Sequence, residues 1–116
     1  MAEFNQYHEP VGELSQEVRT FARVIASLVE EAEAINWYQQ RMHVERNDDA
    51  RGIMRTAQSE EFKHFAMDLE FLARQVPEWR AALQAVLFQP GDIVALGERV
   101  EQAEERVDRQ GNASGA

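Results

Sequence analysis

Three residues of this chain have the types and spacing expected of metal ligands: Glu31, Glu61 and His64. Glu61 and His64 form a Glu-x-x-His motif inside a helical pattern, and residues three apart on a helix lie on one face, with Cβ atoms about 5–6 Å apart. A carboxylate and an imidazole so placed can hold one metal ion together. The spacing alone is a weak signal, because half-exposed charges at the edge of a helix seam show it too.

The position of the predicted chain reversal strengthens the signal. Asn47, Asp48 and Asp49 follow the first helical stretch and are suited to capping the next helix. A reversal near Arg46 leaves Glu31 and Glu61 equally far from it along the chain. In an antiparallel hairpin we therefore expect the two carboxylates at the same level.

Glu31 also interrupts an apolar row that contains Val24, Leu28, Ile35 and Tyr38. A carboxylate among apolar neighbours is costly unless it is paired or bound to something. Glu31 is therefore expected either at the edge of the apolar seam or as a ligand.

The elements that must position these residues are all helical. From about residue 13 the apolar positions recur every three or four residues, which is typical of a long helix packed against other helices; they are Leu14, Val18, Phe21, Ile25, Leu28, Ala32, Ile35 and Met42. A second helix is predicted to about Val76, a third from Pro77 to Phe88, and a fourth stretch from Ile93 to Val107 that Asp92 caps. We expect an extended arm over 1–12, one helical domain over 13–109 and a disordered tail over 110–116.

Composition limits the partners. The 116 residues include 21 acidic and 12 basic ones, giving a net charge of −9, which argues against nucleic acid or an anionic membrane as a partner and favours cations. The chain has no cysteine, so any metal must be held by Glu, Asp and His. No apolar run approaches the roughly 20 residues of a membrane span, and the N-terminal residues lack the pattern of a signal peptide. A cytoplasmic location is expected.

One chain holds only half of a known kind of site. Carboxylate-bridged di-iron and di-manganese centres use one Glu from each of two helices and a Glu-x-x-His from each of the other two. Two copies each of Glu31, Glu61 and His64, related by a dyad, would complete that set. We therefore predict an antiparallel two-helix hairpin, with shorter C-terminal helices, that dimerises into a ferritin-like four-helix bundle.

Four carboxylates match two divalent cations, and oxygen-rich ligation with one imidazole per metal suits iron or manganese. The reaction class that we expect is oxidation of Fe(II), with two irons per dimer site and dioxygen or peroxide as the oxidant. A di-manganese or peroxide-consuming centre, like those of catalases or rubrerythrins, is an alternative. A second alternative is a non-enzymatic helical assembly module whose acidic residues only keep it in solution.

The chain resembles the encapsulated ferritins over roughly residues 7–90. The resemblance is carried by three stretches of the sequence: His8-Glu9-Pro10, Val29-Glu-Glu-Ala-Glu-Ala-Ile-Asn-Trp-Tyr-Gln-Gln-Arg41 and Ser59-Glu-Glu-Phe-Lys-His64. It implies a ferroxidase whose subunits are two-helix hairpins, whose dimers form a ferritin-like bundle, and whose five dimers build an annular decamer. It also implies an encapsulin shell as partner, and a location inside that nanocompartment.

The resemblance assigns roles to particular residues. It implies that Glu31, Glu61 and His64 are the di-iron ligands and that Trp37 and Tyr38 lie beside them. It also implies that Glu30, Glu33 and Glu60 line the route by which metal approaches. Thr56 and Lys63 stand where the family has further His and Glu residues on that route, and Lys63 would repel an incoming cation.

Overall fold

The computed structural model describes residues 6–115, with side chains over 6–110, and its regular structure within that range is entirely helical. A single 3-10 turn, η1 (Val11–Glu13), precedes α1 (Gln16–Val44), α2 (Asp48–Gln75), α3 (Pro77–Val86), α4 (Ile93–Glu98) and α5 (Val100–Gly115). The predicted all-α fold is confirmed. Two compact units divide the chain, residues 1–72 and residues 73–116, and the boundary falls in the last turn of α2.

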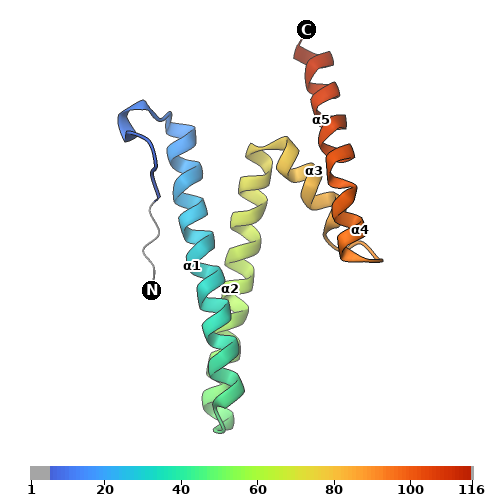
Figure 1. Cartoon of the computed structure of the whole chain (residues 1–116). Coiled ribbons are helices and arrows are strands. Elements are labelled where there is room, and N and C mark those ends of the chain that lie inside the picture. The colour runs from blue at the N-terminus through green and yellow to red at the C-terminus, as the bar shows by residue number, and fades with distance from the viewer. Residues whose placement is uncertain (1–5, 116) are drawn as a thin grey trace. The chain divides into compact units, whose positions relative to one another are not determined.

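The first unit is an antiparallel hairpin of α1 and α2 (Figure 1). Ser15 begins α1, because its hydroxyl accepts a hydrogen bond from the backbone N–H of Val18 at 3.2 Å. Before it, residues 6–10 form no helix or strand, and the Arg19 guanidinium donates to the carbonyl of Val11, which holds η1 against the start of α1.

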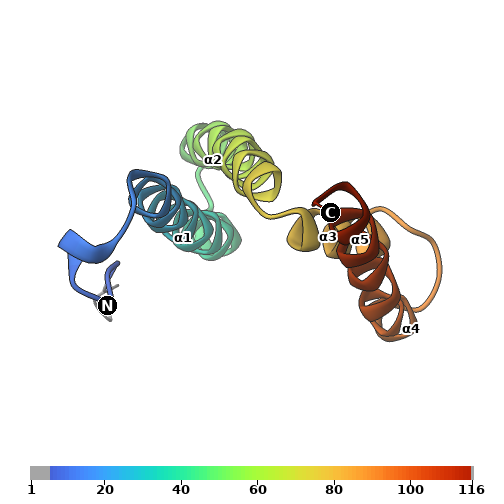
Figure 2. The ribbon, with the colours of Figure 1, turned by 90° about the horizontal axis from the view of Figure 1, so that it is seen from above.

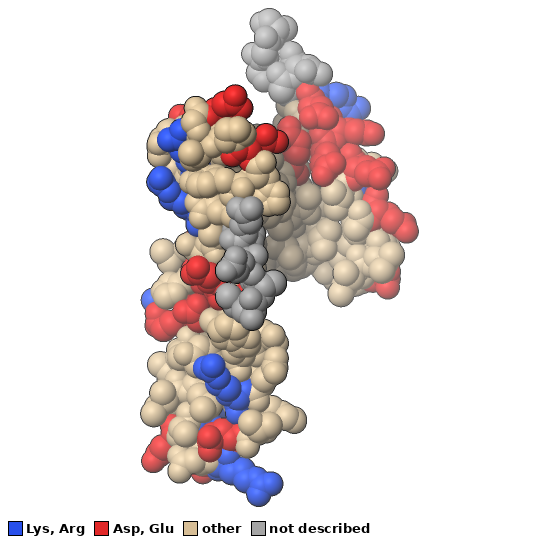
Figure 3. All heavy atoms as spheres, turned by 60° about the vertical axis from the view of Figure 1, so that its left-hand side comes forward, with Lys and Arg blue, Asp and Glu red and all other residues tan. Residues whose placement is uncertain are grey.

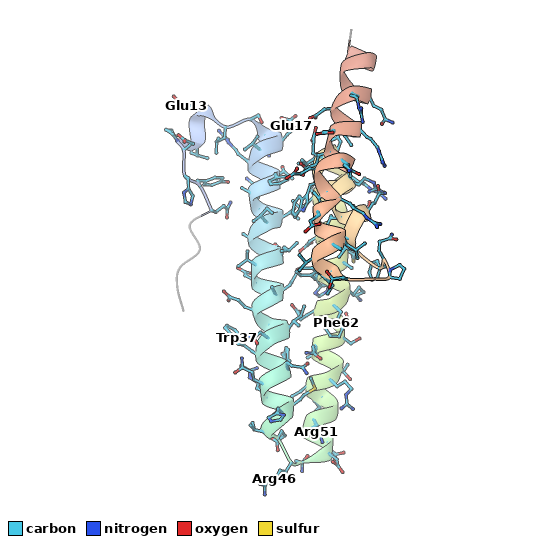
Figure 4. All side chains as sticks on the ribbon, turned by 45° about the vertical axis from the view of Figure 1, so that its right-hand side comes forward. Glu13, Glu17, Trp37, Arg46, Arg51 and Phe62 are labelled. Carbon is cyan, nitrogen blue, oxygen red and sulfur yellow. The ribbon has the colours of Figure 1, made fainter. Side chains whose placement is uncertain are left out.

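The chain reverses where the sequence predicts, through residues 45–47, with Arg46 at the tip of the hairpin (Figure 4). The Glu45 carboxylate accepts the backbone N–H groups of Arg46 and Asn47, each at 3.1 Å. Asn47 then caps α2, since its Oδ1 accepts from the backbone N–H of Ala50 at 2.8 Å. Local hydrogen bonds thus satisfy the backbone donors at the turn.

A buried glutamine links the two helices, which lie side by side in both ribbon views (Figures 1 and 2). Gln58 on α2 is 5% exposed, and its Nε2 donates to the carbonyl oxygen of Ile35 at 3.1 Å and to Oε1 of Gln39 at 2.9 Å. These two hydrogen bonds set the register of α2 against the C-terminal half of α1.

Much of the apolar surface of the hairpin is left uncovered. No residue of α1 is buried, and large apolar side chains of both helices remain open to solvent: Val18 (48% exposed), Trp37 (43%), Phe62 (51%) and Met67 (64%). Trp37 and Phe62 lie at the surface of the hairpin in Figure 4. In the apolar seam predicted for α1, Val18 and Ala32 are exposed and the other residues are half-buried, so the hairpin covers the seam only in part.

In the second unit α3 packs against α5 and α4, with Leu96 buried. Pro77 occupies the first turn of α3, and the Asp92 carboxylate caps α4 by accepting from the backbone N–H of Ala95, both as the sequence predicts. Within the described part of the chain, no helix is both long enough and apolar enough to cross a membrane.

The second unit also corrects three predicted boundaries. α3 ends at Val86 rather than Phe88, because Leu87 has an extended backbone (φ −68°, ψ 134°) and Phe88 has a φ of 61°, and neither conformation continues a right-handed α-helix. The fourth stretch is two helices, since the Arg99 N–H bonds back to the Leu96 carbonyl three residues earlier and tightens the chain there. α5 runs through Gly115, where a disordered tail over 110–116 was expected; helix formation is cooperative, so the helix already formed extends into residues that are poor helix formers by themselves. Residue 116 lies outside the described range.

We predict that Gln58→Ala lowers the free energy of unfolding by about 1–2 kcal/mol, because two partly buried hydrogen bonds are lost and Gln39 loses its donor. Urea unfolding followed by circular dichroism measures the change. The matched control is Gln102→Ala, which removes an exposed glutamine on α5 and should change little. Equal effects of the two substitutions would contradict the role given to Gln58.

We predict that Phe88→Asn raises the free energy of unfolding by about 1 kcal/mol. Phe88 is fully exposed and has a left-handed backbone, which is unfavourable for most L-residues but tolerated by asparagine. Urea unfolding again measures it, with Leu87→Asn as a control at a neighbouring residue of extended backbone. A loss of stability in Phe88→Asn alone would mean that the ring makes a stabilising contact in solution.

Candidate metal centre

The carboxyl groups of Glu31 on α1 and Asp68 on α2 meet across the hairpin, close enough for a hydrogen bond between them. Such a bond needs a proton on one of them. Burial, this hydrogen bond, and the negative charges of Asp68, Glu61 and Glu30 together raise the pKa of Glu31 from 4.5 to about 7. In the chain by itself, Glu31 is therefore partly protonated at neutral pH.

One oxygen of each of these two carboxyl groups is buried and has no hydrogen-bond donor. Oε2 of Glu31 and Oδ2 of Asp68 are both buried and accept no hydrogen bond. Buried polar atoms in proteins are nearly always satisfied, so an unsatisfied oxygen indicates a missing partner such as an ion. A buried carboxylate oxygen without a donor is the kind of atom that a cation would bind.

Glu61 and His64 converge on one face of α2, as their spacing predicts. Nδ1 of His64 lies 3.5 Å from Oε1 of Glu61, and both side chains keep access to solvent, at 46% and 23% exposure. Ligand atoms that share a metal at about 2.0–2.2 Å lie roughly 3 Å apart, so a small side-chain movement would let both bind one ion.

The hairpin therefore offers two pairs of donors rather than one closed cluster. Over residues 6–110, no group of three or more His, Asp or Glu side chains is placed to hold a metal ion. Glu61 is nevertheless close enough to Glu31 for its charge to raise the pKa of Glu31. The donor set, carboxylates with one imidazole, fits iron or manganese, and further donors would have to come from outside the single hairpin.

Trp37 and Tyr38 lie apart from these pairs. Tyr38 has its ring under the Arg41 guanidinium, at 5.4 Å from Cζ to the ring centroid. Trp37 lines an open pocket with Gln40 and Arg41. Among the described side chains, no hydrogen bond or ion pair joins Trp37 or Tyr38 to Glu31, Glu61 or His64. Their predicted place beside the metal stays a prediction for an assembled form.

The residues predicted to line the metal approach differ in their surroundings. Glu30 is exposed and Glu33 is half-buried. Glu60 is paired with Lys63, with Nζ 2.7 Å from Oε2, and the lysine lowers the pKa of that exposed carboxyl. The Thr56 hydroxyl donates to the Gly52 carbonyl of its own helix at 3.0 Å.

Asp68 is not among the predicted ligands, although its place one turn after His64 would let it orient the imidazole. It stands four positions after His64 and seven after Glu61, so it shares their face of α2. That spacing was visible in the sequence. The contact of Asp68 with Glu31 was not predicted. Glu31 and Glu61 lie equally far from Arg46 along the chain, so Glu61 was expected opposite Glu31 across the hairpin.

The chain is similar to known proteins in both sequence and structure. The family model described as EncFtn-like matches residues 6–90. A ferritin-like protein of Thermotoga maritima is 43% identical over 94 residues, which are 81% of this chain and 82% of that protein. An encapsulated ferritin-like protein of Rhodospirillum rubrum is 35% identical over 111 residues, 96% of this chain and 74% of that protein. The crystal structure of protein ne0167 from Nitrosomonas europaea is similar with a TM-score of 0.73 and 37% identity, over 77% of this chain and 98% of that one.

We predict that the metal-free protein becomes more stable as the pH falls from 8 to 5.5. The pKa of Glu31 is about 7 when folded and near 4.5 when unfolded, so the folded chain binds the extra proton in this interval. Glu31→Gln should remove this dependence and raise Tm at pH 8 by roughly 5 °C. Thermal unfolding with a chelator present measures both effects.

The exposed substitution Glu105→Gln serves as the control and should keep the pH dependence of the unchanged chain. If Glu31→Gln keeps that dependence as well, the pKa of Glu31 is not raised by its surroundings.

Proposed function

Since the chain belongs to the EncFtn-like family, we propose that it is a ferroxidase, which oxidises Fe(II) to Fe(III) with dioxygen or peroxide. Family membership supports a ferritin-like, iron-related protein. The observation that carries the finer proposal is the buried, partnerless Oε2 of Glu31, a residue whose charged neighbours, Asp68, Glu61 and Glu30, are all acids. Fe(II) is the substrate that this oxygen would bind.

The reaction would use the paired donors as follows. Two Fe(II) ions give up one electron each, and the two electrons reduce dioxygen to hydrogen peroxide, or peroxide to water, with two protons taken up. Glu31 and Glu61 would hold the ions by oxygen and His64 by its imidazole. The proton that Glu31 shares with Asp68 would leave when a cation takes its place.

The site would be completed by a second copy of the chain. One hairpin brings two donor pairs and no closed cluster over 6–110, while a di-metal bundle centre needs twice the Glu and Glu-x-x-His set. The exposed apolar side chains of α1 and α2 supply a reason for pairing, because burying them is favourable. We propose a dimer as the functional unit, and a decamer as its assembly.

The partner outside the homo-oligomer would be an encapsulin shell. This part of the proposal rests on the relative from Rhodospirillum rubrum, whose name is encapsulated ferritin-like protein.

The chain by itself carries 14 acidic and 7 basic residues over 1–72, a balance that would draw Fe(II) toward the hairpin. Figure 3 shows Asp and Glu side chains interspersed with Lys, Arg and other residues.

We predict that the purified chain oxidises Fe(II) faster than buffer does, and that Glu31→Ala, Glu61→Ala and His64→Ala each return the rate to that of buffer. The reason is that each substitution removes a donor for the substrate iron. Absorbance of the ferric product, recorded together with oxygen consumption, measures the rate. Native mass with and without Fe(II) reports whether the metal drives assembly.

Matched controls are His43→Ala and Glu105→Ala, which remove an exposed imidazole and an exposed carboxylate elsewhere. Replacing iron by manganese and dioxygen by peroxide separates the alternatives. Peroxide consumption with Mn(II) and no acceleration of Fe(II) oxidation would favour a catalase-like centre. A chain that neither binds nor oxidises any of these would be a structural module.

A further inference from the structure

We infer that Asp68 is a further ligand of the proposed centre, binding the same cation as Glu31 through its unsatisfied oxygen. This inference rests on the proposed function, because it takes Fe(II) as the cation. It adds a residue of α2 to the predicted set of Glu31, Glu61 and His64.

Geometry is the first support. Asp68 reaches across the hairpin to the carboxyl group of Glu31, so the two helices already bring their oxygens within hydrogen-bond distance. Oε2 of Glu31 and Oδ2 of Asp68 remain buried and without partners. Two carboxyl groups that meet across the hairpin, each with a buried oxygen that has no donor, are arranged as a pair of ligands on a shared ion.

The surrounding charges are the second support. The charged neighbours that act on Glu31 are all acids, namely Asp68, Glu61 and Glu30. The lysine closest in sequence, Lys63, is paired with Glu60 instead. A structural carboxylate pair in a protein is usually neutralised by a basic side chain. Here no basic side chain is among the charged neighbours of Glu31, and a metal cation would supply the missing positive charge.

The position on α2 is the third support. Asp68 follows His64 by one turn and Glu61 by two, so the three side chains form a row along one face of the helix. A cation between Glu31 and this row would meet carboxylates from both helices. With Asp68 included, each chain would bring three carboxylates instead of two, which better matches the charge of a ferric ion.

Anaerobic titration of the full chain with Fe(II), followed by calorimetry, tests the inference without depending on turnover. Asp68→Asn keeps the size of the side chain and its ability to hydrogen-bond Glu31, but removes the charge. We expect it to weaken Fe(II) binding by more than the roughly 10- to 100-fold that loss of a group orienting a ligand costs. Asp108→Asn, an exposed change on α5, should bind as the unchanged chain does, and Asp68→Glu should keep most of the affinity.

The sign of the effect distinguishes a ligand from a proton partner. If Asp68 only holds a proton on Glu31, Asp68→Asn frees Glu31 and binding at pH 7 becomes tighter or stays unchanged, which overturns the inference. Loss of binding in Glu31→Gln would then leave the proposed centre standing. Unchanged binding in Glu31→Gln as well would overturn the centre itself. Circular dichroism checks that each variant folds. If Asp68→Asn folds poorly, Asp68→Ser takes its place. Weaker Fe(II) binding by Asp68→Ser supports the inference, and unchanged binding overturns the inference.

Discussion

A carboxylate placed among apolar side chains in the middle of α1 is the constraint on which the rest of the hairpin depends. Burial and three acidic neighbours raise the pKa of Glu31 to about 7, so its negative charge is unfavourable in the chain by itself. An apolar residue at this position would pack at lower cost. The unfavourable charge of Glu31 is either neutralised by a proton, in a hydrogen bond to Asp68, or balanced by a cation. Only with a cation does this charge contribute to binding.

The uncovered apolar surface has the same consequence at a larger scale. Val18, Phe62 and Met67 remain about half exposed or more, and no residue of α1 is buried. A hairpin with so little core gains stability from anything that covers it. If the cover is a second hairpin that also completes the ligand set, metal binding and burial stabilise the same assembly, and each strengthens the other. A second hairpin would thus both bury the exposed apolar side chains and complete the set of metal ligands.

Local signals made most of the fold predictable from the sequence. Asn47 and Asp92 are side chains that cap helices, and both cap the helices that follow them. The reversal at Arg46 followed from those signals. The break at Arg99 could not be foreseen, because apolar positions continue in step across it, and the geometry there arises from a single shortened turn.

The candidate site was predictable only in part, since it depends on how two helices are offset along their axes. The Glu61–His64 pair lies within one helix and follows from the helical repeat. The partner of Glu31 depends on register, which Gln58 helps to set through Ile35 and Gln39. A buried glutamine that bonds to two residues of the facing helix produces no recurring pattern in the sequence. Neither the alignment of α2 along α1 nor the position of Asp68 opposite Glu31 could therefore be derived.

The same dependence on contacts changes the meaning of Lys63. As a residue in a sequence it would repel a cation, but in the structure its ammonium group is 2.7 Å from the carboxylate of Glu60, and the pair carries no net charge. An exposed pair of this kind is weak and is screened beyond about 8–10 Å. The Glu60–Lys63 pair therefore neither attracts nor strongly repels Fe(II). The attraction must come from the unneutralised acids around Glu31. Selection of the cation would then take place at the inner carboxylates themselves.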